Sequence, residues 1–161
     1  MSSVLTPLVP LAHADIARLI PHQGAMCLLA RADTWDELMI VCHADNHRDP
    51  RHPLRSRSGL LSTCLIEYAA QAMALHGSLL ARATAGASAR PGFLAAARNV
   101  VLTCLNLDDL PRTTPDELRI EASCEARDHR QLQYAFAVRH GGTPLAAGHI
   151  TVVLDASPLP P

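Results

Sequence analysis

Apolar and polar residues alternate along the second half of the chain. Between Glu117 and Arg127, polar or charged residues alternate with five apolar ones: Leu118, Ile120, Ala122, Cys124 and Ala126. This period of two predicts a strand with one face buried. Residues 131–140 repeat it, with an inward face of Leu132, Tyr134, Phe136 and Val138. A Gly141-Gly142 turn then leads to a strand over 144–154, and an earlier strand is expected over 93–107, so we predict an antiparallel meander.

The first half of the chain follows a different pattern. Ile16, Leu19 and Ile20 have helical spacing, which predicts a helix over 12–20 that Pro21 ends. We then expect a hairpin of strands 26–32 and 37–44 joined by the turn 33–36, a loop over 45–58, a long helix over 60–83, and a linker over 84–92.

The long helix sets the expected architecture. It is Ala-rich and apolar around nearly its whole circumference, which is typical of a helix that is covered on all sides. We therefore predict an α+β fold in which a curled antiparallel sheet wraps around one long central helix. The length of 161 residues fits a single domain, expected over 1–155, followed by a disordered Pro-rich tail over 156–161.

Composition and charge exclude several classes of function. The net charge is −1 and every cationic side chain is Arg, so a nucleic acid is not an expected partner. No apolar run is long enough for a membrane span, and the five dispersed cysteines (Cys27, Cys42, Cys64, Cys104 and Cys124) are expected to be reduced and buried in a cytoplasmic protein.

One local concentration of charge departs from this balance. Within the predicted loop, the stretch 48–57 holds one acid, Asp49, and four arginines: Arg48, Arg51, Arg55 and Arg57. They form either a solvated loop or an anchor for an acidic partner.

Glu67 is the main candidate for chemistry, because it lies within the most apolar helix of the chain. Burying a carboxylate without partners is costly, and such a cost often marks a functional group. The alternative is that Glu67 faces water in the first helical turns, where the helix dipole favours an acid.

Two sequence segments resemble a known family. The segments are Ile20-Pro-His-Gln-Gly-Ala-Met-Cys-Leu-Leu29 and Ile66-Glu-Tyr-Ala-Ala-Gln-Ala72. They are similar to motifs of the hotdog-fold dehydratases that act on 3-hydroxyacyl-carrier-protein thioesters, and above all to those of the aryl-polyene and pigment branch. The resemblance implies a hotdog fold, a lyase that needs no cofactor, an acyl carrier protein as partner, and a dimer with an identical or a different hotdog chain.

The resemblance also implies roles for individual residues. Elimination of water needs a base for the proton next to the carbonyl and an acid for the departing hydroxyl. Glu67 matches the family's helix carboxyl and is expected to be the general acid, with its pKa raised by apolar neighbours, while Gln71 holds it by a hydrogen bond. The base is His22 or His52, with His47 as a third candidate. The N–H groups of Ser62 or Thr63 are expected to polarise the thioester oxygen.

Three other interpretations remain open. Because the stretch around His52 departs from the His-Phe-Pro-Gly pattern of the fatty-acid enzymes, the chain could be a non-catalytic subunit whose partner supplies the His. A thioesterase on the same fold is the second alternative. A metal site at His43, His47 and His52, next to Cys42, is the third, but the spacing matches no structural zinc pattern, and we expect no metal.

Overall fold

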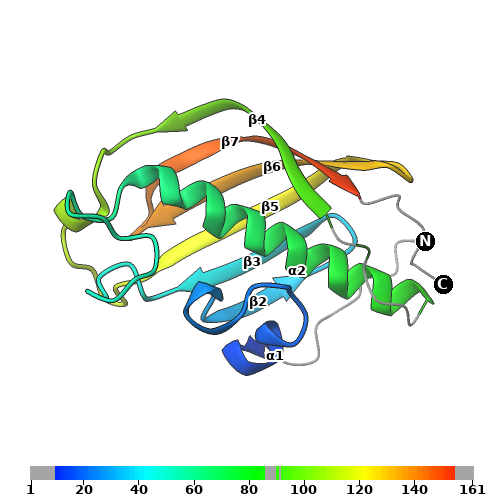
Figure 1. Ribbon diagram of the computed structural model, residues 1–161, viewed down its shortest axis with the longest axis horizontal. Helices are drawn as coiled ribbons and strands as arrows, with labels where there is room; N and C mark the ends of the chain where they lie inside the picture. The colour runs from blue at the N-terminus through cyan, green and yellow to red at the C-terminus, as the bar shows by residue number, and fades with distance from the viewer. Residues whose placement is uncertain (1–9, 86–89, 91, 155–161) are drawn as a thin grey trace.

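A single antiparallel sheet and one long helix make up most of the molecule (Figure 1). The computed structural model describes residues 10–85, 90 and 92–154, so the predicted tail lies outside the described residues. The strands are β1 (Leu11–Ala12), β2 (Arg31–Trp35), β3 (Met39–Ala44), β4 (Gly92–Leu102), β5 (Leu118–Arg127), β6 (Gln131–His140) and β7 (Thr143–Leu154). The helices are α1 (His13–Ala17) and α2 (Leu65–Ala85), with short 3₁₀ turns η1 (Gly24–Met26), η2 (Ser62–Cys64) and η3 (Leu107–Asp109).

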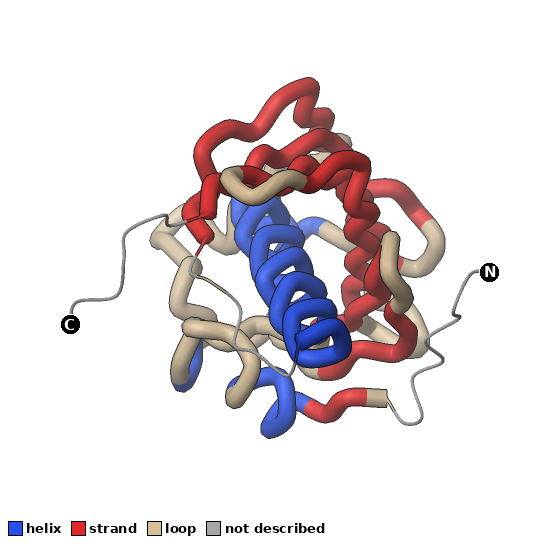
Figure 2. The backbone as a smooth tube through the Cα atoms, turned by 90° about the vertical axis from the view of Figure 1, so that its right-hand side faces the viewer, coloured by secondary structure: helices blue, strands red, loops and turns tan. Residues whose placement is uncertain are grey.

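The sheet curves around α2, as the sequence predicted. Its seven strands lie in the order β1-β2-β3-β5-β6-β7-β4, and α2 crosses its concave face (Figures 1 and 2). The main core lies between these two layers and includes Leu65, Tyr68 and Leu75 of the helix, all fully buried. None of the helices in the described residues combines the length and apolarity that crossing a bilayer requires.

The predicted meander is confirmed. In β5 and β6 the inward residues face each other in register, with Ile120 opposite Val138 and Ala122 opposite Phe136. The expected burial fails at one end of β5, where a register shift between Cys124 and Ala126 leaves Cys124 half-buried and Ala126 exposed. The strand predicted over 93–107 is shorter, because the chain leaves the sheet after Leu102.

The long helix is not covered all round, which corrects the sequence expectation. Half-buried positions recur along α2 at helical spacing, at Ile66, Glu67, Ala70, Ala74, Gly77 and Ala81. The sheet packs against the opposite face, while the segment between α1 and β2 contacts the first turns of α2 through Glu67 and Gln71. A polar group on the stripe can therefore reach solvent or a ligand.

The first half of the chain departs most from its predicted elements. The predicted strand 26–32 is wrong over most of its length, since pairing with β3 begins only at Arg31. Cys27, Leu28 and Leu29 are all buried without alternating, because this segment runs against α2. Helix α1 is also shorter than predicted, while residues 45–58, all described, form turns as expected.

Strand β4 forms one edge of the sheet and pairs on one side with β7. It and the segment after it expose large apolar side chains: Phe93, Leu94, Val101 and Leu105. An 11-residue edge strand of this kind presents unpaired backbone groups to another chain.

The cysteines are free, as expected. Cys27, Cys42 and Cys64 are buried, whereas Cys104 and Cys124 are half-buried, so the expectation of burial holds for three of the five.

Candidate active site

Glu67 and His22 form a direct contact within one chain. Glu67 lies in the first turn of α2, and His22 follows Pro21 in the segment between α1 and η1. The Nε2 atom of His22 is 3.2 Å from Oε1 of Glu67. The two side chains are 26% and 33% exposed, so the pair is sheltered but accessible.

Gln71 fixes this pair in place. It lies one helical turn after Glu67 on α2, and its Nε2 donates to Oε1 of Glu67 at 3.1 Å and to the carbonyl of Met26 at 2.7 Å. Its own Oε1 accepts a 2.8 Å hydrogen bond from the N–H of Leu28. The fully buried amide thus holds the segment that follows His22 against the helix that carries Glu67.

These contacts determine the ionisation of Glu67. Hydrogen bonds from His22 first, and then from Gln71, lower the pKa of Glu67, and together they outweigh the effect of burial, which raises it. The raised pKa expected from the sequence is wrong, because that expectation did not include the hydrogen bond from His22, which lowers the pKa of Glu67 the most. Glu67 is therefore a carboxylate at neutral pH.

His52 lies elsewhere in the fold and makes a different set of hydrogen bonds. Its Nδ1 accepts from the N–H of Leu54 at 3.1 Å, which places the proton on Nε2, 2.9 Å from the hydroxyl of Tyr68. The Tyr68 hydroxyl donates in turn to Asn46. His52 is buried, and its ring tethers the loop to α2.

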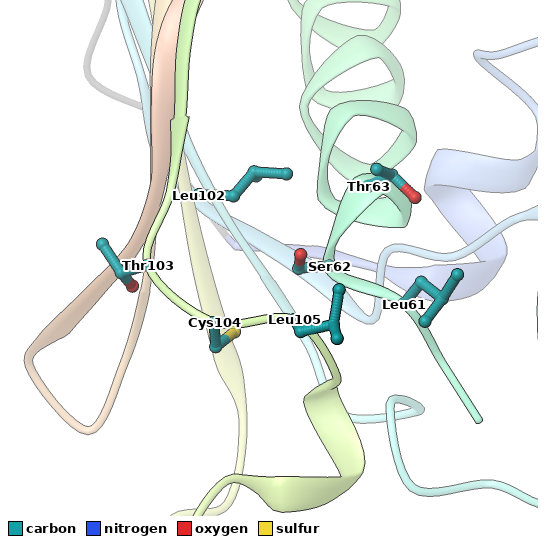
Figure 3. Close-up of a pocket in the computed structure, with 7 residues that line it drawn as sticks. All are labelled: Leu61, Ser62, Thr63, Leu102, Thr103, Cys104 and Leu105. Carbon is teal, nitrogen blue, oxygen red and sulfur yellow. The ribbon is translucent and has the colours of Figure 1, made fainter. Parts of the chain in front are cut away.

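Ser62 and Thr63 line a pocket of about 440 Å³ at the start of α2 (Figure 3). The pocket is bounded on one side by η2 and on the other by the end of β4 and the residues after it, with the full lining Leu61, Ser62, Thr63, Leu102, Thr103, Cys104 and Leu105. A 2.9 Å hydrogen bond from the N–H of Ser62 to the carbonyl of Leu105 joins the two sides. Glu67 and His22 are not among the lining residues, but Thr63 precedes Glu67 by one helical turn.

The four loop arginines divide into two pairs. Arg48 donates to Asp116 at 2.6 Å and to the carbonyl of Leu110, while Arg55 donates to Asp108 at 2.6 and 2.8 Å and to the carbonyl of His47. Both tie the loop to the segment before β5. Arg51 and Arg57 are exposed instead, with the side chain of Arg51 90% accessible.

The histidines near Cys42 do not gather around one point. His43 lies beside Asp33 and Glu117, His52 beside Tyr68, and His47 beside Asp116 and His140. Within the described residues, potential ligand atoms do converge at His47, Asp116 and His140. This group could not be found from the sequence, because its members come from three distant segments.

Sequence reasoning also missed the backbone groups of Met26 and Leu28 and the β4 side of the pocket. The motif around His22 extends to Leu29, which could have indicated that these residues lie at the site. Nothing in the sequence pattern indicated that Leu102 to Leu105 would face η2.

Comparison with known proteins gives a family and a fold. The model of the ApeP-like family, described as ApeP dehydratase, matches residues 14–158. A comparison with curated proteins gave no significant match. A chain from the dehydratase heterocomplex ApeI:P of Xenorhabdus doucetiae superposes with a TM-score of 0.73 at 21% identity, over 88% of this chain and 91% of that one.

Two thioesterase structures share the fold more distantly. Zebra fish thioesterase superfamily member 2 gives a TM-score of 0.58 at 11% identity, over 90% of this chain and 99% of that one. A hypothetical thioesterase from Streptococcus pneumoniae TIGR4, solved with coenzyme A, gives 0.55 at 11% identity, over 77% and 84% of the two chains. The hotdog fold expected from the sequence is confirmed.

Proposed function

Because the chain belongs to the ApeP-like family of hotdog dehydratases, we propose that it eliminates water from a 3-hydroxyacyl thioester held by an acyl carrier protein, with His22 and Glu67 as the reacting pair. The pathway we propose is a fatty-acid or polyketide-like synthesis of the aryl-polyene type, in the cytoplasm. The observation that carries the proposal is the 3.2 Å contact between the imidazole and the carboxylate.

The pair can supply both proton transfers of an elimination. With the imidazole protonated and Glu67 ionised, the carboxylate takes the proton from the carbon next to the thioester, and the imidazolium protonates the departing hydroxyl. The pair ends as a carboxylic acid and a neutral imidazole, and one proton transfer across the contact restores the starting form. The lowered pKa of Glu67 favours this assignment, with Glu67 as the base and His22 as the acid. The resemblance to the family implied the opposite assignment, with Glu67 as the acid.

The remaining contacts suit a substrate that enters from the half-buried stripe of α2. Gln71 and His22 both contact Oε1 of Glu67, so neither occupies Oε2, which we assign to the substrate. The N–H of Ser62 already donates to the carbonyl of Leu105, so we assign the expected backbone donor to Thr63, where the positive end of the helix dipole would also lie near the thioester oxygen.

Exposed charge supports a carrier protein as the donor of the acyl chain. Arg51 and Arg57 remain accessible in the loop before η2, while Arg48 and Arg55 are engaged within the fold. Acyl carrier proteins are acidic, so the exposed guanidinium groups of Arg57 and of Arg51, which lies 3.6 Å from Asp49, would guide the complex.

A second hotdog chain is the proposed partner at β4. The exposed edge carries Phe93, Leu94 and Val101, and the pocket lies where this edge ends. A partner strand paired with β4 would cover these apolar residues and close one side of the pocket. We propose a different hotdog chain as partner, because the similar ApeI:P structure is a heterocomplex.

One experiment tests the proposed reaction against its alternatives. The purified chain, alone and with a second hotdog protein added, is given a 3-hydroxyacyl carrier protein, and the acyl group is followed by mass spectrometry. Loss of one water from the acyl group supports the proposal. Loss of water only when the second hotdog protein is present would show that the active enzyme needs both chains. Release of the free acid and of carrier thiol without dehydration would identify a thioesterase and contradict the proposal.

A further inference from the structure

Two buried imidazoles and a carboxylate converge at the end of the sheet where β3 and β6 end and β5 begins. His47 follows β3 in the loop, Asp116 precedes β5, and His140 is the last residue of β6. Their potential ligand atoms all lie within 4.8 Å of one another. The Nε2 atom of His140 is 2.7 Å from Oδ1 of Asp116, and Nε2 of His47 is 3.6 Å from the same oxygen.

His47 is the unusual member of this group. Its side chain is 1% exposed, and neither ring nitrogen has a hydrogen-bond partner among the described residues. Its ring meets that of His140 edge-on, with centroids 5.4 Å apart. A buried polar group without a partner costs stability, so a native protein normally provides one.

We propose that His47, Asp116 and His140 bind a divalent transition-metal ion of the zinc class. Two imidazole nitrogens and one carboxylate oxygen are ligands that Zn²⁺, Co²⁺ and Ni²⁺ accept, and a set of three leaves one position for water. The ion would occupy the space between Nε2 of His47 and Oδ1 of Asp116, and would give the orphaned imidazole a partner.

The surroundings hold the carboxylate in a suitable orientation. Arg48 donates to Oδ2 of Asp116 at 2.6 Å and to Oδ1 at 3.4 Å, and Arg112 lies 3.7 Å from Oδ2. The stronger contacts of the cations are therefore with Oδ2, while Oδ1 lies 2.7 Å from Nε2 of His140. The hydroxyl of Thr113 lies 3.3 Å from Nε2 of His140. Once that nitrogen binds the ion, the hydroxyl would contact the water in the ion's open position instead. An arginine on the far oxygen of a ligating carboxylate is a typical outer-shell contact.

The ion would act as a cross-link between three segments. His47 belongs to the loop that carries Arg51 and His52, whereas Asp116 and His140 belong to the ends of adjacent strands. Metal bound there would fix the loop to the sheet and raise the melting temperature without contacting the His22–Glu67 pair. The proposal is therefore independent of the reaction proposed above.

The test uses full-length chain prepared without a His tag and freed of metal by chelation. Calorimetric titration with ZnCl₂ and CoCl₂ measures binding, and visible absorption of the Co²⁺ form reports the ligand set. We expect one ion per chain, an absorption spectrum typical of nitrogen and oxygen ligands, and a higher melting temperature with ZnCl₂ but not with MgCl₂.

Matched variants locate the site. His47→Asn, Asp116→Asn and His140→Gln should each weaken Zn²⁺ binding by about tenfold or more, as loss of a metal contact typically does. His149→Gln is the control, because it alters an exposed His 3.6 Å from Glu125, and it should leave binding unchanged. Failure of the wild-type chain to bind Zn²⁺ or Co²⁺, or unchanged binding in a folded His47→Asn variant, would overturn the proposal. The Co²⁺ spectrum of the wild type keeps the test decisive if a variant fails to fold.

Discussion

The backbone N–H of Leu28 donates a 2.8 Å hydrogen bond to the side-chain oxygen of Gln71. The same amide donates its own protons to Met26 and Glu67. One buried side chain thereby joins the segment after His22 to the helix that carries Glu67, and both the fold and the candidate active site depend on it.

Replacing Gln71 by Leu should damage stability and activity together. It leaves the buried N–H of Leu28 without an acceptor, which costs about 1–3 kcal/mol. Urea unfolding measures the loss, and steady-state kinetics should show a lower kcat rather than a higher KM. Gln133→Leu, on an exposed position of β6, is the control and should leave both values near those of the wild type.

The lowered pKa of Glu67 predicts a specific dependence of stability on pH. Because folding lowers this pKa, the folded state binds fewer protons, and the stabilisation is complete above the ordinary carboxyl pKa of about 4.3. It is lost as the pH falls from there through the lower folded-state pKa. In His22→Ala the largest lowering contact is gone, so the pKa of Glu67 should rise.

Carbon NMR of the Glu67 carboxyl measures this titration directly. Urea unfolding at several pH values should give a smaller acid-side loss of unfolding free energy in His22→Ala than in the wild type. A wild-type carboxyl that titrates at or above its ordinary pKa would contradict the assigned contacts.

The sequence predicted correctly those strands that bury one face and expose the other, because their apolar and polar residues alternate. The strands at 118–127 and 131–140 follow directly from alternation, since a one-residue slip would turn Ile120 and Val138 outward. Cys27 to Leu29 misled the prediction, because a buried run of apolar residues looks the same whether its partner is a strand or a helix. Only the contact with Gln71 distinguishes them.

The site could be predicted as a set of residues but not as a geometry. The motif around His22 and the helix motif around Glu67 indicated both partners, yet neither gives a distance across 45 positions of the chain. The direction of the Glu67 pKa depends on that distance, so sequence reasoning assigned it wrongly. Asp116 and His140 could not be linked to His47 either, because only the strand order brings them together.

The two histidines that the sequence offered as the base, His22 and His52, should respond oppositely to substitution. His52→Leu removes an acceptor from Leu54 and a donor from Tyr68 in the interior, so the free energy of unfolding should fall by about 1–3 kcal/mol while turnover persists below the melting temperature. His22→Gln should do the reverse, with near-normal melting and a turnover lower by about 10² to 10⁴-fold. Loss of turnover in a folded His52→Leu variant would shift the proposed role to His52.

Charge reversal should separate the carrier-facing arginines from the structural ones. Arg51→Glu with Arg57→Glu should raise KM for the acyl carrier protein, most strongly at low salt, with kcat and melting unchanged. Arg55→Gln should lower the melting temperature instead, because it breaks the contact with Asp108. Arg130→Glu, in the turn between β5 and β6 at the far end of the sheet (Figure 1), is the control. An unaltered KM in the double variant would place the carrier site elsewhere.

The proposed elimination depends on Glu67 and His22 of one chain acting as a pair. Its most direct test is the turnover of a 3-hydroxyacyl carrier protein by Glu67→Gln, His22→Gln and the double variant, with the partner subunit present if the wild type needs it. Each single change should lower kcat by about 10² to 10⁴-fold, and the double change should cost no more than the worse single one, because residues that act as a unit are not additive. A folded Glu67→Gln variant with kcat within a few-fold of wild type would contradict the claim.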